Sequence, residues 1–154
     1  MVLPHVILAT LAALPAVENG RGQPAPARPV AEARRQAARG SHEPFCVEGV
    51  VTMETGLLRS GPGDFYMQDA TAGIMVQGGA DLRLPRGARI LACGQLGLDG
   101  EIEPMLQQAQ VSVLGTAKPP PPLPLSLAGA LEGQAAGSLV KVQGQVVQLS
   151  IGET

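Results

Sequence analysis

The residues best suited to chemistry lie in the stretch FYMQDATAGIMVQ (residues 65–77), where an acid and a hydroxyl stand two positions apart between two apolar runs. Asp69 and Thr71 are side-chain types that act as a general base or a nucleophile in active-site loops. The same two types are typical of a tight turn, because their oxygens accept hydrogen bonds from nearby backbone N–H groups. A catalytic aspartate needs a partner base, acid or metal ligand, and the sequence offers no such companion. We therefore interpret DATAG as the turn of a hairpin, in which Gly73 can adopt a positive φ where the hairpin needs one.

No nucleophile elbow, phosphate-binding loop or paired-carboxylate motif is visible elsewhere in the sequence. We accordingly expect no enzyme activity, no catalytic residues, no metal site and no cofactor.

The two cysteines, Cys46 and Cys93, do not have the spacing of a metal-binding motif, and the two histidines, His5 and His42, lie far from each other in the chain. Two interpretations of the cysteines stay open. One is a pair of buried thiols that behave as small apolar side chains. The other is a disulfide, which requires that the chain is exported to an oxidising compartment.

Charge is distributed unevenly along the 154 residues, whose net charge is −2. Residues 1–43 carry five arginines and three glutamates, residues 44–116 carry four arginines against eight acids, and residues 117–154 are balanced. Binding of a polyanion depends on Lys and Arg side chains that neutralise phosphates. The acidic central region therefore argues against a nucleic-acid partner.

The N-terminal segment contains an apolar run from Val6 to Val17 that has the length of a signal-peptide core and is too short to cross a bilayer as a helix. The small residues Ala25 and Ala27 are typical of a cleavage site, although no Lys or Arg precedes Arg21. We expect residues 1–27 to be a signal peptide and the protein to lie on the periplasmic or extracellular side of the membrane. Whether the segment is cleaved or kept as an anchor stays open.

A linker with a short helix is expected over residues 28–43, ended by Gly40, and strand patterns begin at residue 45. Twenty glycines and fourteen prolines favour short strands joined by turns. Alternating apolar residues predict five strands, at 45–52, 64–69, 73–77, 88–96 and 109–115. Gly94 interrupts the fourth of these strands as a bulge or bend, and Asp99 and Gly100 predict a hairpin turn after it. Five short strands of this kind predict a small closed or half-closed barrel over residues 44–116.

Residues 117–135 contain four consecutive prolines and are expected to be an extended linker followed by a short helix. The strand pattern at 138–150 repeats the first strand, with Gly144 at the place of Gly49. We therefore expect residues 136–154 to begin a second, incomplete module. The chain is then a fragment or a truncated reading frame, and a decaying gene remnant is a further interpretation.

The order of these motifs resembles the oligonucleotide/oligosaccharide-binding (OB) fold modules of exported bacterial proteins. It is most similar to the tandem modules in the extracytoplasmic part of sensor histidine kinases. That family shows a G-V-V-T strand, an F-x-Q-D-x-T-G-G-I hairpin, an L-x-x-G-x-x-V-x-V-x-G strand and a closing V-x-V-L-G-x-x-x-x-P segment. The matching residues here are Gly49, Val50, Val51, Thr52, Phe65, Gln68, Asp69, Thr71, Gly73, Ile74, Leu84, Gly87, Ile90, Gly94, Val111, Val113, Leu114, Gly115 and Pro119. Ala72 and Ala92 depart from the pattern, and the likeness covers roughly residues 30–150.

The resemblance implies an all-β protein with a five-stranded OB-like Greek-key barrel. It also implies a non-catalytic extracytoplasmic sensory or interaction module of a signal-transduction protein, with kinase-type domains downstream in a full-length relative. The alternative function is a secreted OB-fold binder of single-stranded nucleic acid, a nucleotide or a saccharide.

The resemblance also implies where a ligand would bind, because OB folds commonly use the face of their second and third strands. The candidate ligand contacts are Tyr66, as a stacking residue, with Gln68, Arg59 and Arg89, and the ligand itself is unknown. Since the first and fourth strands of such a barrel are neighbours, Cys46 and Cys93 are expected to approach each other.

Overall fold

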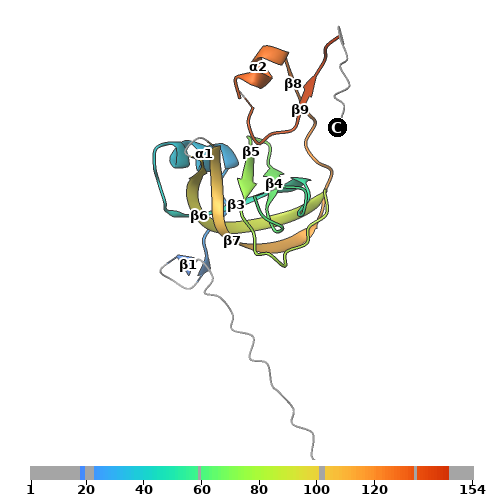
Figure 1. Cartoon of the computed structure of the whole chain (residues 1–154). Coiled ribbons are helices and arrows are strands. Elements are labelled where there is room, and N and C mark those ends of the chain that lie inside the picture. Colours follow the sequence, from blue (N-terminus) through green and yellow to red (C-terminus); the bar gives the residue numbers. More distant parts are fainter. Residues whose placement is uncertain (1–17, 20–22, 59, 101–102, 134, 146–154) are drawn as a thin grey trace, which may run out of the picture.

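The computed structural model describes residues 18–19, 23–58, 60–100, 103–133 and 135–145. Most of the expected signal peptide, Arg59 and the end of the expected second module lie outside the described residues. Figure 1 shows a barrel with the helix α1 at one end and a small unit containing α2 beside it. In the described part of the chain, no helix is long and apolar enough to cross a membrane.

Five strands form a closed barrel in the order β3-β4-β5-β7-β6. Their bounds are β3 Pro44–Met53, β4 Phe65–Gln68, β5 Gly73–Val76, β6 Ala88–Asp99 and β7 Glu103–Thr116. Neighbouring strands are antiparallel except β5 and β7, which pair in parallel. This connectivity is that of an OB-like Greek-key barrel, so the predicted fold class is confirmed.

The remaining elements are short. They are β1 Glu18–Asn19, β2 Gln23–Pro24, α1 Val30–Ala38, β8 Leu123–Leu125, α2 Leu127–Leu131 and β9 Val140–Val142. The strands β1 and β2 pair with each other, and β8 pairs in parallel with β9. The strand expected over 138–150 is thus described only as the short β9, and its last residues, from 146 on, lie outside the described part.

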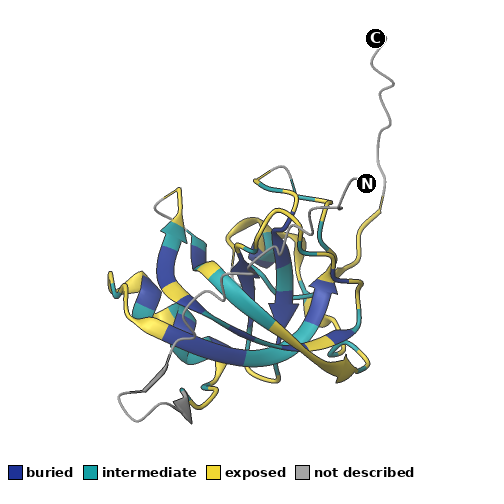
Figure 2. Cartoon of the chain, turned by 90° about the horizontal axis from the view of Figure 1, so that it is seen from below, coloured by how far each residue is buried: buried dark blue, intermediate teal, exposed yellow. Residues whose placement is uncertain are grey.

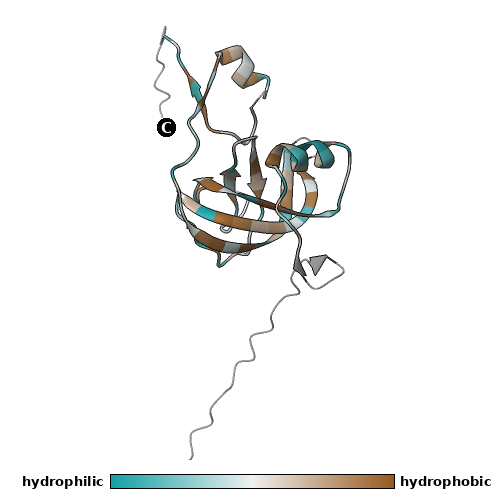
Figure 3. Ribbon diagram, turned by 180° about the vertical axis from the view of Figure 1, so that it is seen from behind, coloured by the Kyte–Doolittle hydropathy of each residue, from teal (hydrophilic) through white to brown (hydrophobic). Residues whose placement is uncertain are grey.

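The core fills the barrel with aliphatic side chains and two phenylalanines, because strand residues alternate between the two faces of the sheet. Phe45, Val47, Phe65 and Met67 are at most 1% exposed. Figure 2 shows such buried positions along the strands, and Figure 3 shows that the same strands carry the hydrophobic residues. The helix α1 closes the barrel with its small apolar face, which includes Val30, Ala33 and Ala37.

Several local predictions are confirmed. Gly40 follows α1 with a φ of 79°, a left-handed conformation that ends helices. The register of β6 and β7 shifts at Gly94, where two residues of β7 oppose one of β6, which is a β-bulge. Asp99 pairs with Glu103 across the predicted hairpin turn.

The turn does not use the freedom of Gly73 to take a positive φ, because the φ of this glycine is not positive. The absence of a side chain matters there for another reason. A Cβ on Gly73 would collide with the carbonyl oxygen of Gly137, whose backbone passes directly over β5.

Candidate ligand-binding site

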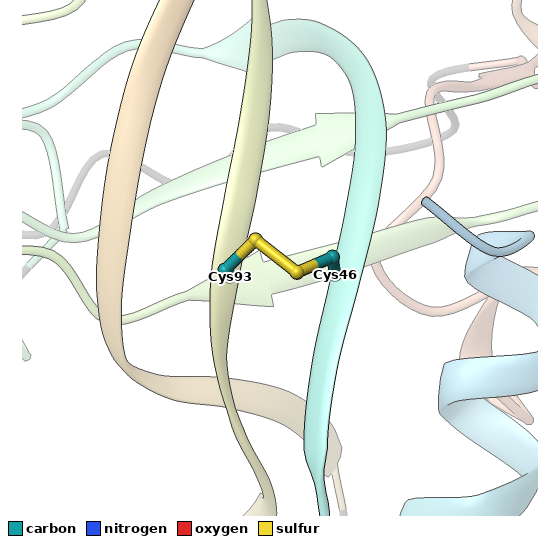
Figure 4. The surroundings of a disulfide bond; sticks show 2 residues. All are labelled: Cys46 and Cys93. Carbon is teal, nitrogen blue, oxygen red and sulfur yellow. A yellow bond between two sulfur atoms is a disulfide. The ribbon is translucent and has the colours of Figure 1, made fainter. Parts of the chain in front are cut away.

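The two cysteines form a disulfide that joins β3 and β6 (Figure 4). Cys46 and Cys93 are direct partners in the antiparallel register, and the S–S distance is 2.12 Å. Phe45 and Val47 belong to the core, so Cys46 between them lies on the outer side of the barrel wall. The structure thus joins Cys46 and Cys93 in a disulfide, the second of the two interpretations that the sequence left open.

The DATAG segment is the turn between β4 and β5, as predicted. One carboxylate oxygen of Asp69 accepts hydrogen bonds from the Thr71 N–H at 2.7 Å, the Thr71 hydroxyl at 2.6 Å and the Ala72 N–H at 2.9 Å. These three bonds hold the turn together.

The same turn also caps the helix α1, which the sequence did not predict. The second carboxylate oxygen of Asp69 accepts the Val30 N–H at 2.8 Å, and the Thr71 hydroxyl accepts the Ala31 N–H at 3.0 Å. The residue before the helix is Pro29, which supplies no side-chain cap. The turn therefore satisfies N–H groups that would otherwise lack partners at the start of the helix.

Two opposing effects act on the carboxyl group of Asp69. Burial raises its pKa, but the hydrogen bonds from Thr71, Val30 and Ala72 outweigh burial and leave the pKa below its ordinary value. The charged form of Asp69 is thus the form that the fold stabilises.

On the outer face of β4 and β5, Tyr66 is hydrogen-bonded to Glu103. Its hydroxyl donates to the carboxylate oxygens of Glu103 at 3.1 and 3.2 Å. Burial, followed by the charge of Glu103 and the hydrogen bond to it, raises the pKa of Tyr66 to about 12. Tyr66 is half-buried in this arrangement, so the predicted stacking residue is not an open platform.

Part of this face, at Gly73 and Gln68, is covered by the chain itself. Residues 137–139, called here the covering segment, cross β4 and β5, and Figure 1 shows the α2 unit beside these strands. The Gly73 N–H donates to the Ser138 hydroxyl at 2.9 Å, and the Leu139 N–H donates to the Gln68 side-chain oxygen at 2.9 Å. Gln68 is 5% exposed as a result.

The predicted ligand contacts are only partly brought together. Gln68 and Arg89 line one hollow of about 480 Å³, whereas Tyr66 lines another of about 190 Å³ together with the covering segment. Arg89 donates to a carboxylate oxygen of Glu48 from two nitrogens, at 2.6 and 2.8 Å. Arg59 lies outside the described residues.

A larger hollow, of about 690 Å³, was not predicted. It is bounded by the loop of residues 60–64, the loop of residues 77–80 and the facing parts of β6 and β7. We call it the Asp64 hollow, because the buried Asp64 contributes to its wall. Neither Asp64 nor Glu103 belongs to a sequence motif, and only the barrel brings them into these positions.

Comparisons with known proteins leave the family open. No protein-family model matches the chain, and no curated protein matches it. Among solved structures, the chain is similar to an aspartyl tRNA synthetase from Entamoeba histolytica, with 11% sequence identity and a TM-score of 0.48. The match covers 96% of this chain and 37% of the synthetase. Such a distant likeness carries no argument about function, and the fold follows from the strand order of the barrel itself.

Proposed function

We propose that this chain is a non-catalytic, extracytoplasmic OB-fold interaction module of a bacterial signal-transduction protein. The observation that carries the proposal is the occupied outer face of β4 and β5. There, Gly73 and Gln68 hold a polypeptide, the covering segment, through two hydrogen bonds of 2.9 Å. A face that already binds polypeptide within the chain is suited to contacts between adjacent protein modules.

The disulfide supports the extracytoplasmic part of the proposal. Disulfides persist in oxidising compartments and are rare in the cytosol of mesophiles. The experiment is alkylation of the full chain, expressed in a Gram-negative bacterium and separated into periplasmic and cytoplasmic fractions. We expect a periplasmic protein whose Cys46 and Cys93 react with a maleimide only after reduction and unfolding. Protein found in the cytoplasm with two reactive thiols would contradict export.

The alternative of single-stranded nucleic-acid binding has less support. Its stacking residue Tyr66 is bound to Glu103, and Arg89 is paired with Glu48. Fluorescence anisotropy with a labelled oligothymidylate at low salt tests it directly. We expect no binding; salt-sensitive binding that Tyr66→Ala weakens would favour the alternative, since stacking contributes about 1–3 kcal/mol per base.

A further inference from the structure

The Asp64 hollow has the dimensions of a small-molecule site. Its volume of about 690 Å³ lies within the range of roughly 300–1,000 Å³ that is usual for ligand pockets. It lies apart from the outer face of β4 and β5, and none of the candidate contacts Tyr66, Gln68 and Arg89 lines it.

Glycines allow the two loops of the hollow to cross. A Cβ on Gly63 would collide with the carbonyl oxygen of Gly79, and a Cβ on Gly78 would collide with that of Gly63. The contact joins the loop before β4 to the loop after β5, and Asp64, the last residue before β4, belongs to the lining of the hollow.

Asp64 is the unusual residue of this hollow. It is 3% exposed, and in the described part of the chain no hydrogen bond or ion pair reaches its carboxylate. In that part, every side-chain nitrogen or oxygen that is shielded from solvent has a hydrogen-bond partner, so an oxygen without a partner must touch solvent. The remaining exposure of Asp64 therefore includes its carboxylate oxygens, which have access to the hollow.

Protein surrounds most of Asp64, so an opposite charge or further hydrogen-bond donors beside its carboxylate would be favourable. The described lining contains no Lys, Arg or His that would supply the charge. The structure thus leaves room for a cationic group of a ligand next to Asp64.

The rest of the lining is suited to hydroxyl groups. Exposed Gln77, Gln95 and Gln108 carry carboxamides, which both donate and accept hydrogen bonds. Gln108 has a φ of 50°, an uncommon conformation for a residue other than glycine, and it sits in the β-bulge opposite Gly94. The bulge thus places Gln108, one of these three residues, in the lining of the hollow.

We propose that the Asp64 hollow binds a small organic ammonium that carries hydroxyl groups, of the size of an amino sugar or an amino-sugar dimer. The ammonium pairs with the Asp64 carboxylate, and the carboxamides bind the hydroxyls. This inference deepens the proposed function by giving the interaction module a ligand class, and it rests on that proposal.

The test uses the full chain and three probes: glucosamine, its β-1,4-linked dimer, and glucose as the neutral counterpart. Binding is measured by calorimetry and by amide chemical shifts at about pH 6, where an ordinary carboxylate is ionised. We expect the dimer or glucosamine to bind with a Kd below about 10 mM, at least tenfold tighter than glucose. The shifts are expected at Gly61, Gly63, Gly78 and Gly79.

The decisive variant is Asp64→Asn, which keeps the shape of the side chain and removes its charge. We expect it to weaken binding by about 10- to 100-fold, the usual range for losing a charge-assisted hydrogen bond. The matched control is Asp99→Asn, an exposed acid on the β6–β7 hairpin that does not line the hollow.

Three outcomes would overturn the inference: no binding of either amino compound, equal binding of glucose, or equal loss in the two variants. If Asp64→Asn fails to fold, the amide shifts of the wild-type chain still decide, because shifts away from the two loops contradict the site. Failure of this test would leave the export and alkylation results intact, so it is distinguishable from failure of the proposed function.

Discussion

Replacing Asp69 by alanine removes the carboxylate that joins the β4–β5 turn to the start of α1. The side chain accepts four hydrogen bonds, three within the turn and one from the Val30 N–H. Loss of a helix cap typically costs about 0.5–2 kcal/mol. Val30 is fully buried, and leaving a buried donor without a partner costs about 1–3 kcal/mol. Because these two terms overlap, we expect Asp69→Ala to lower the free energy of unfolding by about 2–3 kcal/mol.

The assay is urea unfolding followed by far-UV circular dichroism, since the protein contains no tryptophan. The matched control is Asp81→Ala, an exposed acid whose side chain makes no hydrogen bond or ion pair in the described part. Its effect is expected to stay within about 0.5 kcal/mol. Hydrogen exchange gives the local readout: the amides of Val30 and Ala31 should lose protection. The reasoning is refuted if Asp69→Ala and Asp81→Ala have the same unfolding midpoint.

The acid dependence of this effect has a definite sign. The pKa of Asp69 is lower in the folded state than in the unfolded state, so the unfolded state binds the proton more readily. The stabilisation is complete above the unfolded-state pKa of about 3.9 and is lost as the pH falls through the folded-state value. The difference between wild type and Asp69→Ala should therefore shrink in acid.

Three further predictions concern other contacts. Absorbance titration of the single tyrosine should place the pKa of Tyr66 near 12, and Glu103→Gln should lower this pKa only in part, because burial is the largest cause of the shift and remains. The contribution of the protonated Tyr66 hydroxyl to stability is present below about pH 10 and is lost as the pH rises through about 12. An unchanged titration in Glu103→Gln would contradict the contact. Gly73→Ala should displace residues 137–139 and speed the hydrogen exchange of their amides by about tenfold or more. The control is Gly79→Ala, where the added methyl group meets open space and the exchange should not change. Equal exchange in both variants would show that residues 137–139 do not lie on β5. Reduction of the disulfide, which closes a sequence separation of 47 residues, should lower stability by about 4 kcal/mol, and an unchanged urea midpoint in dithiothreitol would argue against the bond.

The sequence by itself determined the features that depend on near neighbours in the chain. Alternation of apolar residues located the barrel strands, and Gly40 and Gly94 marked the end of α1 and the bulge. The DATAG turn was predictable because Asp69 bonds to N–H groups two and three residues away. Such contacts are fixed by local backbone geometry, so the residue types alone indicate them.

Only the tertiary structure decided which distant groups meet. Asp69 also caps a helix that begins 39 residues earlier, and Gly73 is required by the backbone of residues 137–139. Asp64 is the first residue of the strand predicted at 64–69, yet closure of the barrel and the crossing of two glycine loops bury it beside a hollow, directly before β4. Partners so far apart in sequence are selected by strand order and register, which no local pattern encodes. The candidate ligand site is therefore a product of barrel closure.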